Sequence, residues 1–117
     1  MDFVDASGSI RSFLKAAFND EFESYRTWKI EEKAPLPCLL VKTVGKNTIQ
    51  LLIRSDNDIE ALEKCTEVGN YLKRNFAYVD GVNLFDADFQ TAPIPDVDDV
   101  SGKDEAWCYM RINYFEN

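Results

Sequence analysis

The chain has 117 residues and a mass of 13.4 kDa, which fits one domain, residues 1–117, that can bury a core without disulfides or metals. A composition of 45% hydrophobic and 29% charged residues excludes an intrinsically disordered chain. The formal charge of −8 argues against nucleic-acid binding, and the absence of His removes the commonest general base and a frequent metal ligand, so we expect no enzyme and no cofactor.

Targeting signals and cysteine usage both favour a protein that is made in the cytoplasm and stays soluble. The first residues contain no cationic segment followed by an apolar run, and no apolar stretch approaches the roughly 20 residues of a membrane span. Cys38, Cys65 and Cys108 form no CxxC pair and each lies in an apolar segment. We therefore expect buried free thiols, although a small enzyme using one of them stays open as an alternative.

The first predicted elements are a helix and a mixed strand. Apolar residues spaced by three and one between Ile10 and Phe18 predict a helix over residues 8–19, capped by Ser7 or Ser9. Residues 22–30 alternate with mixed faces, which is typical of a strand at a sheet edge. The Pro-containing residues 31–37 read as a loop.

A β-hairpin is the strongest local signal in the chain. Residues 38–44 and 48–54 are rich in β-branched and apolar side chains and are separated by Gly45-Lys46-Asn47. Gly and Asn adopt positive φ readily, as tight hairpins require, so we expect positive φ in this turn.

A second helix follows the hairpin. Residues 55–58, Ser-Asp-Asn-Asp, supply N-cap candidates and acidic groups suited to the positive end of a helix dipole. The predicted apolar stripe consists of Ile59, Leu62, Cys65, Gly69, Leu72 and Phe76. Gly69 on that stripe indicates either close approach of the helix to the sheet or simple tolerance of a poor helix former.

The C-terminal third contains two strands and a long connection. After the turn signal Asp80-Gly81, residues 82–90 and 106–115 alternate as strands. Residues 91–105 are acidic and contain Pro and Gly, and a connection of this length is expected to be functional or disordered. Short connections favour antiparallel pairing, so we expect an α+β two-layer sandwich: a mostly antiparallel sheet of four to five strands with two helices on one face.

Two chemical features of this region require explanation. The run Asp96-Val97-Asp98-Asp99-Val100-Ser101-Gly102 invites a calcium site, but its Gly falls one position late for an EF-hand and no acidic ligand occupies the twelfth position. A solvated acidic loop is the better interpretation.

Trp107, Tyr109 and Phe115 would lie on the sheet face opposite the helices. Exposed apolar patches of this kind mark interfaces, so we expect an oligomer.

The order of elements resembles the tail terminator (tail completion) proteins of long-tailed bacteriophages and related neck and minor capsid proteins. The matching segments span nearly the whole chain as patterns of residue type. They are an N-terminal helix, Leu36-Pro37-Cys38-Leu39-Leu40-Val41, Ile49-Gln50-Leu51-Leu52-Ile53, Ser55-Asp56 before a helix with Ala61, Val68 and Leu72, Ile94-Pro95-Asp96 to Ser101-Gly102-Lys103, and Met110-Arg111-Ile112-Asn113.

The resemblance implies a non-enzymatic virion protein that forms a homohexameric ring at the head-proximal end of the tail tube. Such a ring stops tube polymerisation and contacts the tail tube protein and the head-tail connector or stopper protein, while DNA passes through its lumen without specific binding. From the charge of −8 we expect carboxylates to line that lumen. A head-side connector or stopper, and an acidic DNA-mimic inhibitor, are the alternatives.

Function is expected on two surfaces. One is the aromatic face of the last strand, Trp107, Tyr109 and Phe115, as a contact between subunits. The other is the 91–105 loop, with the charged residues Asp96, Asp98, Asp99, Lys103 and Asp104, which we expect to order on meeting the tail tube or a neighbouring subunit.

Overall fold

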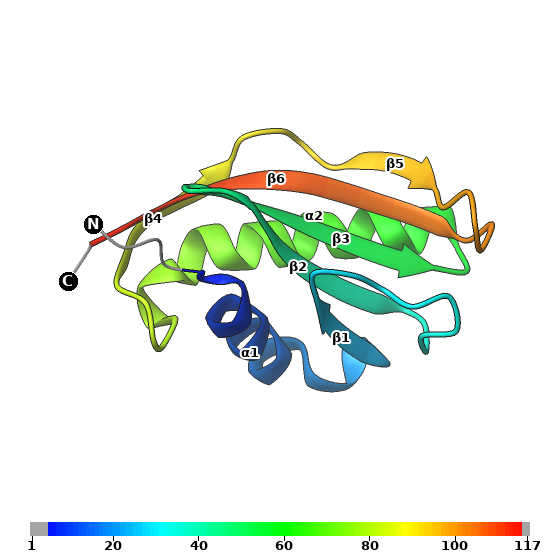
Figure 1. Ribbon diagram of the computed structural model, residues 1–117, viewed down its shortest axis with the longest axis horizontal. Coiled ribbons are helices and arrows are strands. Elements are labelled where there is room, and N and C mark those ends of the chain that lie inside the picture. Colours follow the sequence, from blue (N-terminus) through cyan, green and yellow to red (C-terminus); the bar gives the residue numbers. More distant parts are fainter. Residues whose placement is uncertain (1–4, 116–117) are drawn as a thin grey trace.

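The computed structural model describes residues 5–115 and has the α+β architecture expected from the sequence (Figure 1). A six-stranded sheet forms one layer and two helices form the other. The helices are α1 (Ser7–Phe18) and α2 (Asp58–Asn75), with short 3-10 turns at Asn19–Glu21 and Phe76–Tyr78. The strands are β1 (Ser24–Thr27), β2 (Cys38–Gly45), β3 (Thr48–Ser55), β4 (Leu84–Phe89), β5 (Ile94–Val97) and β6 (Asp104–Tyr114).

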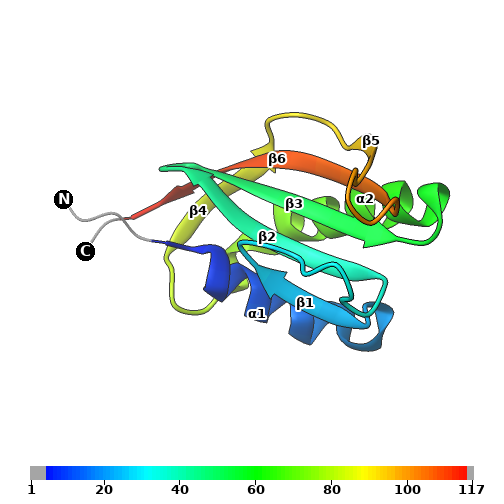
Figure 2. The same cartoon turned by 45° about the vertical axis from the view of Figure 1, so that its right-hand side comes forward.

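The sheet has the strand order β1-β2-β3-β6-β4, and β5 also pairs with β6. The edge position of β1 confirms the interpretation of its mixed pattern. Its pairing with β2 is parallel, and the other strand pairs are antiparallel, so the sheet is mostly antiparallel as expected. Residues 28–37 carry the chain back to the end of the sheet where β1 began, so β2 starts beside Ser24 and runs in the same direction (Figure 2).

The expected long loop is the main correction to the predicted fold. Residues 94–97 form β5, which pairs antiparallel with β6 in the register Ile94 to Trp107 and Val97 to Asp104. A turn over residues 98–103 closes the hairpin, with the N–H of Asp98 donating to the Lys103 carbonyl at 2.9 Å. Opposite Cys108 and Tyr109, residues 90–93 form an irregular stretch between β4 and β5. The segment is therefore a structured edge of the sheet.

Both helices lie on one face of the sheet, as expected. α1 packs on β1 and β2, and α2 runs along β3, β6 and β4 (Figures 1 and 2). The buried side of α2 consists of Ala61, Cys65, Val68, Gly69 and Leu72. The predicted stripe was thus wrong at its first turns, since 64% of Ile59 is exposed and Leu62 is exposed as well.

The helix starts are fixed by side chains, though not always those predicted. Neither Ser7 nor Ser9 caps α1; instead Asp5 accepts hydrogen bonds from the N–H and hydroxyl of Ser7 and from the Thr43 hydroxyl. Asp5 therefore ties the start of α1 to β2. At α2, Asn57 accepts from the N–H of Glu60 at 2.9 Å, which confirms an N-cap within residues 55–58.

The β2–β3 turn differs from the expected geometry. The hairpin is confirmed, but the residues with positive φ in the described chain are Asn19, Trp28, Gly81 and Gly102. Thr43 pairs with Ile49 and Gly45 pairs with Thr48, so the register shifts between these two pairs. The hairpin is thus closed by an irregularity in β2 and not by a turn with positive φ.

Candidate interaction surfaces

The sheet face that the helices leave bare carries an apolar row across the strands. The register aligns Leu40 of β2, Leu52 of β3, Trp107 of β6 and Ile94 of β5. Leu40 is buried, Leu52 and Trp107 are half-buried, and 41% of Ile94 is exposed. We call this row, together with Tyr109, the outer face. It offers apolar area that water contacts in the isolated chain.

Trp107 and Tyr109 occupy the outer face as the sequence predicted. Their ring centroids lie 5.2 Å apart with an interplanar angle of 54°, which is a favourable aromatic arrangement. Phe115 does not join them, because it lies six residues further along the chain, about 20 Å away for an extended strand. The predicted aromatic surface is therefore divided between two places.

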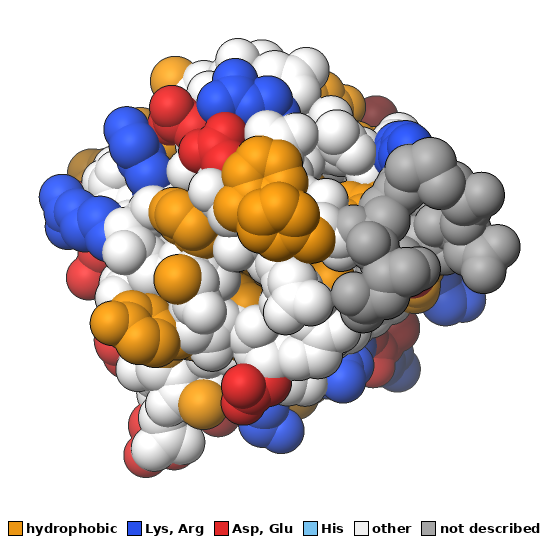
Figure 3. Space-filling model, turned by 90° about the vertical axis from the view of Figure 1, so that its left-hand side faces the viewer, with side chains coloured by type: hydrophobic (Ala, Val, Ile, Leu, Met, Phe, Trp, Pro, Cys, Tyr) orange, Lys and Arg blue, Asp and Glu red, His pale blue; other side chains and the backbone are white. Residues whose placement is uncertain are grey.

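The second place is the end of the molecule shown in Figure 3, where apolar side chains gather. Phe115 stacks on Phe85 of β4 with ring centroids 4.6 Å apart, and 63% and 49% of these residues are exposed. Tyr78, in the segment before β4, is exposed as well. An open depression of about 620 Å³ beside them is lined by residues 77, 79–84 and Phe115. We call Tyr78, Phe85 and Phe115 the aromatic end.

The opposite end of the 42 Å long axis holds the negative charge. Residues 54–63 and 96–105, at the start of α2 and around the β5–β6 turn, contain nine carboxylates and two cations, a net charge of −7. Residues 5–115 together contain 19 carboxylates and 13 cations, a net charge of −6. The remaining described residues are therefore close to neutral, and we call residues 54–63 and 96–105 the acidic end.

The acidic end is held in place by ion pairs. Arg54 of β3 lies 2.9 Å from Glu105 and 3.4 Å from Asp98, and both Arg54 and Glu105 are buried. Burial raises the pKa of Glu105, partly opposed by Arg54. Hydrogen bonds from Ser101 lower the pKa of Asp98. Lys103 reaches Asp56 at 2.7 Å, so the turn is tied to the loop before α2.

The other predicted site residues of this region have local roles. Asp96 accepts a hydrogen bond from the N–H of Val97, Asp99 is exposed in the turn, and Asp104 is the first residue of β6. The expectation that the 91–105 segment lacks structure until it meets a partner is contradicted by β5 and by these contacts. Sequence reasoning missed Arg54 and Glu105, whose spacing of 51 residues gives no local signal.

On the side of β4 and β5 that faces away from β6, few backbone N–H groups are free to bond another strand. The N–H of Phe89 bonds the Asp88 carboxylate and the N–H of Val97 bonds the Asp96 carboxylate, each at 2.8 Å. Pro95 has no N–H at all. This edge is therefore poorly suited to pairing with another strand, and contacts with a partner are expected on side-chain surfaces instead.

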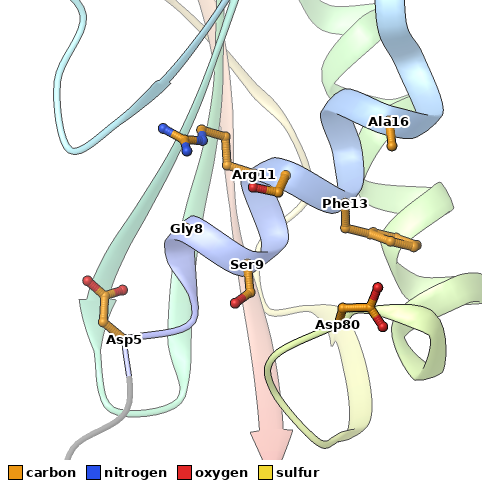
Figure 4. Close-up of a pocket in the computed structure, with 8 residues that line it drawn as sticks. Asp5, Gly8, Ser9, Arg11, Phe13, Ala16 and Asp80 are labelled. Atoms are coloured by element: carbon orange, nitrogen blue, oxygen red, sulfur yellow. The ribbon is translucent and has the colours of Figure 1, made fainter.

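A further depression lies at the start of α1 (Figure 4). It has a volume of about 620 Å³, is open to solvent, and is lined by Asp5, Gly8, Ser9, Arg11, Ser12, Phe13, Ala16 and Asp80. The Asp5 carboxylate accepts hydrogen bonds from the hydroxyls of Ser7 and Thr43. Within residues 5–115, the Ser9 hydroxyl forms no hydrogen bond to Asp5 or Asp80, the two carboxylates of this depression.

Residues 5–115 contain neither a cluster of metal ligands nor a helix suited to spanning a membrane. No three His, Cys, Asp or Glu side chains of that range are grouped to hold a metal ion. The Asp98 carboxylate, which the calcium hypothesis required, is taken by Ser101 and Arg54. In the same range, no helix is long and apolar enough to cross a membrane.

No protein-family model matches the chain, and no curated protein matches it.

Proposed function

We propose that the chain is a structural virion protein that forms a homohexameric ring at the head-proximal end of a bacteriophage tail tube. The ring ends tube polymerisation and joins the tail to the head-tail connector. It requires no cofactor and performs no catalysis. The order of elements along the chain and the α+β fold are compatible with this role.

One observation carries the proposal: net negative charge gathers at one end of the subunit, and exposed aromatic side chains gather at the other. The acidic end has a net charge of −7, although Ile59, Leu62, Val97 and Val100 are exposed there as well. The exposed aromatic side chains lie at the aromatic end, and the outer face is only partly exposed. A subunit built in this way can bind neighbours through its apolar areas while it presents carboxylates to a channel.

In the proposed ring the acidic end faces the lumen. Carboxylates repel the phosphates of DNA, so the duplex passes without binding. The outer face and the aromatic end contact neighbouring subunits. Each large aromatic side chain buries extensive area at an interface, which makes Trp107 and Phe115 the expected main contributors to assembly.

Within the acidic end, we place the β5–β6 turn on the side of the ring that meets the tail tube, while the other carboxylates of this end face the lumen. Because Arg54 and Lys103 already hold the turn against the rest of the subunit, docking would cost less conformational entropy than ordering a free loop. Asp99 in the turn is exposed and forms no hydrogen bond or ion pair among residues 5–115, so it is available to a partner.

The experiment compares assembly of the purified wild type with that of three variants. Light scattering coupled to size exclusion, with negative-stain microscopy, is expected to show hexameric rings for the wild type. Trp107→Ala and Phe115→Ala are expected to shift the mass toward monomer. Asp99→Lys, which alters charge but no apolar contact, is the matched control and should assemble normally while losing tail joining in a phage complementation assay.

The outcomes separate the candidate functions. A wild type that stays monomeric at high concentration would contradict the ring. A monomer that binds a DNA-binding protein through its acidic end would instead favour an acidic DNA mimic. A ring that binds the portal side but leaves tail tubes unterminated would favour a head-side connector or stopper.

A further inference from the structure

Two cysteines far apart in the sequence face each other in the core. The Sγ atoms of Cys65 on α2 and Cys108 on β6 lie 3.8 Å apart, and both side chains are fully buried. The Cys65 Sγ also lies 3.9 Å from the carbonyl oxygen of Leu51. The pair thus lies where α2 packs against the centre of the sheet.

We propose that Cys65 and Cys108 form a reversible disulfide that links α2 to β6 under oxidising conditions. The two sulfur atoms lie 3.8 Å apart and are separated by about 2.05 Å in a disulfide. They must therefore move closer together for the bond to form. The proposed bond requires that rotation of the two side chains supply this movement. The fold brings the two thiols into contact across the packing of α2 on β6.

The reaction requires an oxidant, and a disulfide such as oxidised glutathione is sufficient. One thiolate attacks the glutathione disulfide, forms a mixed disulfide and releases one reduced glutathione. The second thiolate then attacks the protein sulfur of that mixed disulfide and releases the other glutathione. The two protein thiols lose two electrons and two protons in total, and the oxidant gains them.

Burial makes this reaction slow in the closed protein. Contact with Cys108 and desolvation raise the pKa of the Cys65 thiol, so little of the reactive thiolate is present. Glutathione also has no path to a fully buried sulfur. Oxidation must therefore follow opening of α2 from the sheet, and its rate should rise under mildly destabilising conditions.

The third cysteine provides an internal reference. Cys38 is also fully buried, but it pairs with Arg54 in the β2–β3 register, on the face of the sheet away from the helices. A sheet thus separates Cys38 from the other two thiols. Complete formation of the proposed bond should leave one free thiol of the original three.

The time at which the bond would form rests on the proposed function. A virion protein is made in a reducing cytoplasm and is released into an oxidising medium. The subunit would then fold and assemble in the dithiol form and gain its cross-link after release. The chemistry itself depends only on the folded subunit.

The experiment treats the full chain with a mixture of oxidised and reduced glutathione in urea below the unfolding midpoint. The expected product loses the mass of two hydrogen atoms and shows one free thiol on titration after denaturation. Peptide mapping should link Cys65 to Cys108, and the melting temperature should rise by roughly 5–15 °C until a reductant is added. Cys38→Ala should give the same product with no free thiol.

Cys65→Ala and Cys108→Ala are the matched controls, and neither should gain an internal disulfide. Three remaining thiols, a stable glutathione adduct or a bond to Cys38 in the wild type would overturn the proposal. The state of assembly is measured on the same samples. A ring without the bond refutes only the disulfide, and the bond in a monomer refutes only the ring.

Discussion

Phe89 of β4 lies directly over Gly69 of α2. A Cβ atom placed on Gly69 would lie 2.4 Å from Cζ and 2.5 Å from Cε1 of Phe89, so the aromatic ring would have to shift to admit a side chain there. The Phe89 ring therefore fills the space that a side chain at position 69 would need. Close approach, one of the two interpretations that the sequence left open, is the correct one.

Gly69→Ala is expected to destabilise the protein although Ala favours helix. The overpacking against Phe89 costs about 1–3 kcal/mol, and the gain in helix propensity offsets about 1 kcal/mol of it. In a Phe89→Leu background the same substitution should become neutral or stabilising. Urea unfolding of the four proteins measures this coupling, and equal effects of Gly69→Ala in both backgrounds would contradict it.

Arg54 is expected to be essential for the stability of the fold, because the carboxylate of Glu105 is buried beside it. Arg54→Leu leaves a buried carboxylate without its cation and should lower the free energy of unfolding by about 3 kcal/mol at pH 7. The double variant Arg54→Leu with Glu105→Leu should recover much of that loss. Denaturant midpoints at pH 7 provide the comparison.

The pH dependence of the Arg54 variant gives an independent check. Burial already raises the pKa of Glu105 in the wild type, and loss of Arg54 removes the group that opposes this rise. A group with a raised folded pKa binds its proton more tightly when folded, so lowering the pH from 7 to 5 should reduce the variant's deficit relative to the wild type. A constant deficit would show that Glu105 is not the cause.

Acid is expected to weaken the β5–β6 turn through Asp98. Ser101 lowers the pKa of Asp98 in the folded protein, so its contribution to stability is present above its unfolded pKa and is lost as the pH falls through the folded value. Asp98→Asn should therefore lose less stability between pH 5 and pH 3 than the wild type. Amide exchange of residues 98–103 should report the same difference, and parallel curves would exclude this role.

The β5 edge is expected to resist strand pairing because of two adjacent residues. Pro95→Thr with Asp96→Thr restores one N–H and releases that of Val97, so an exposed edge with free donors results. Sedimentation velocity should reveal higher-order association of the double variant beyond any ring. Asp99→Thr removes a carboxylate from the adjacent turn without creating a donor and is the control.

Removing the acidic segment by deleting residues 96–103 would test its function poorly, because residues 96 and 97 belong to β5. It would remove half of β5 and one partner of Arg54 as well as the turn, so loss of tail joining after such a deletion could reflect unfolding. Single charge changes at exposed positions such as Asp99 alter the surface and leave the hairpin intact.

Local patterns in the sequence determined the hairpin, both helices and the buried side of β6. Alternation in residues 106–114 fixed which side chains face the core, because a strand turns successive residues to opposite faces. The residues that alternate with Trp107 and Tyr109 are all buried, namely Ala106, Cys108, Met110, Ile112 and Tyr114. The N-cap of α2 followed from Asn57 and its neighbours for the same local reason.

Only the tertiary structure decided the rest, because those features depend on residues distant in sequence. β5 has little strand propensity of its own, with Pro95 at its centre, and forms because β6 offers it a partner. The Arg54–Glu105 pair, the separation of Phe115 from Trp107 and the contact between Cys65 and Cys108 arise in the same way. The sequence set the amount of negative charge, and folding gathered it at one end.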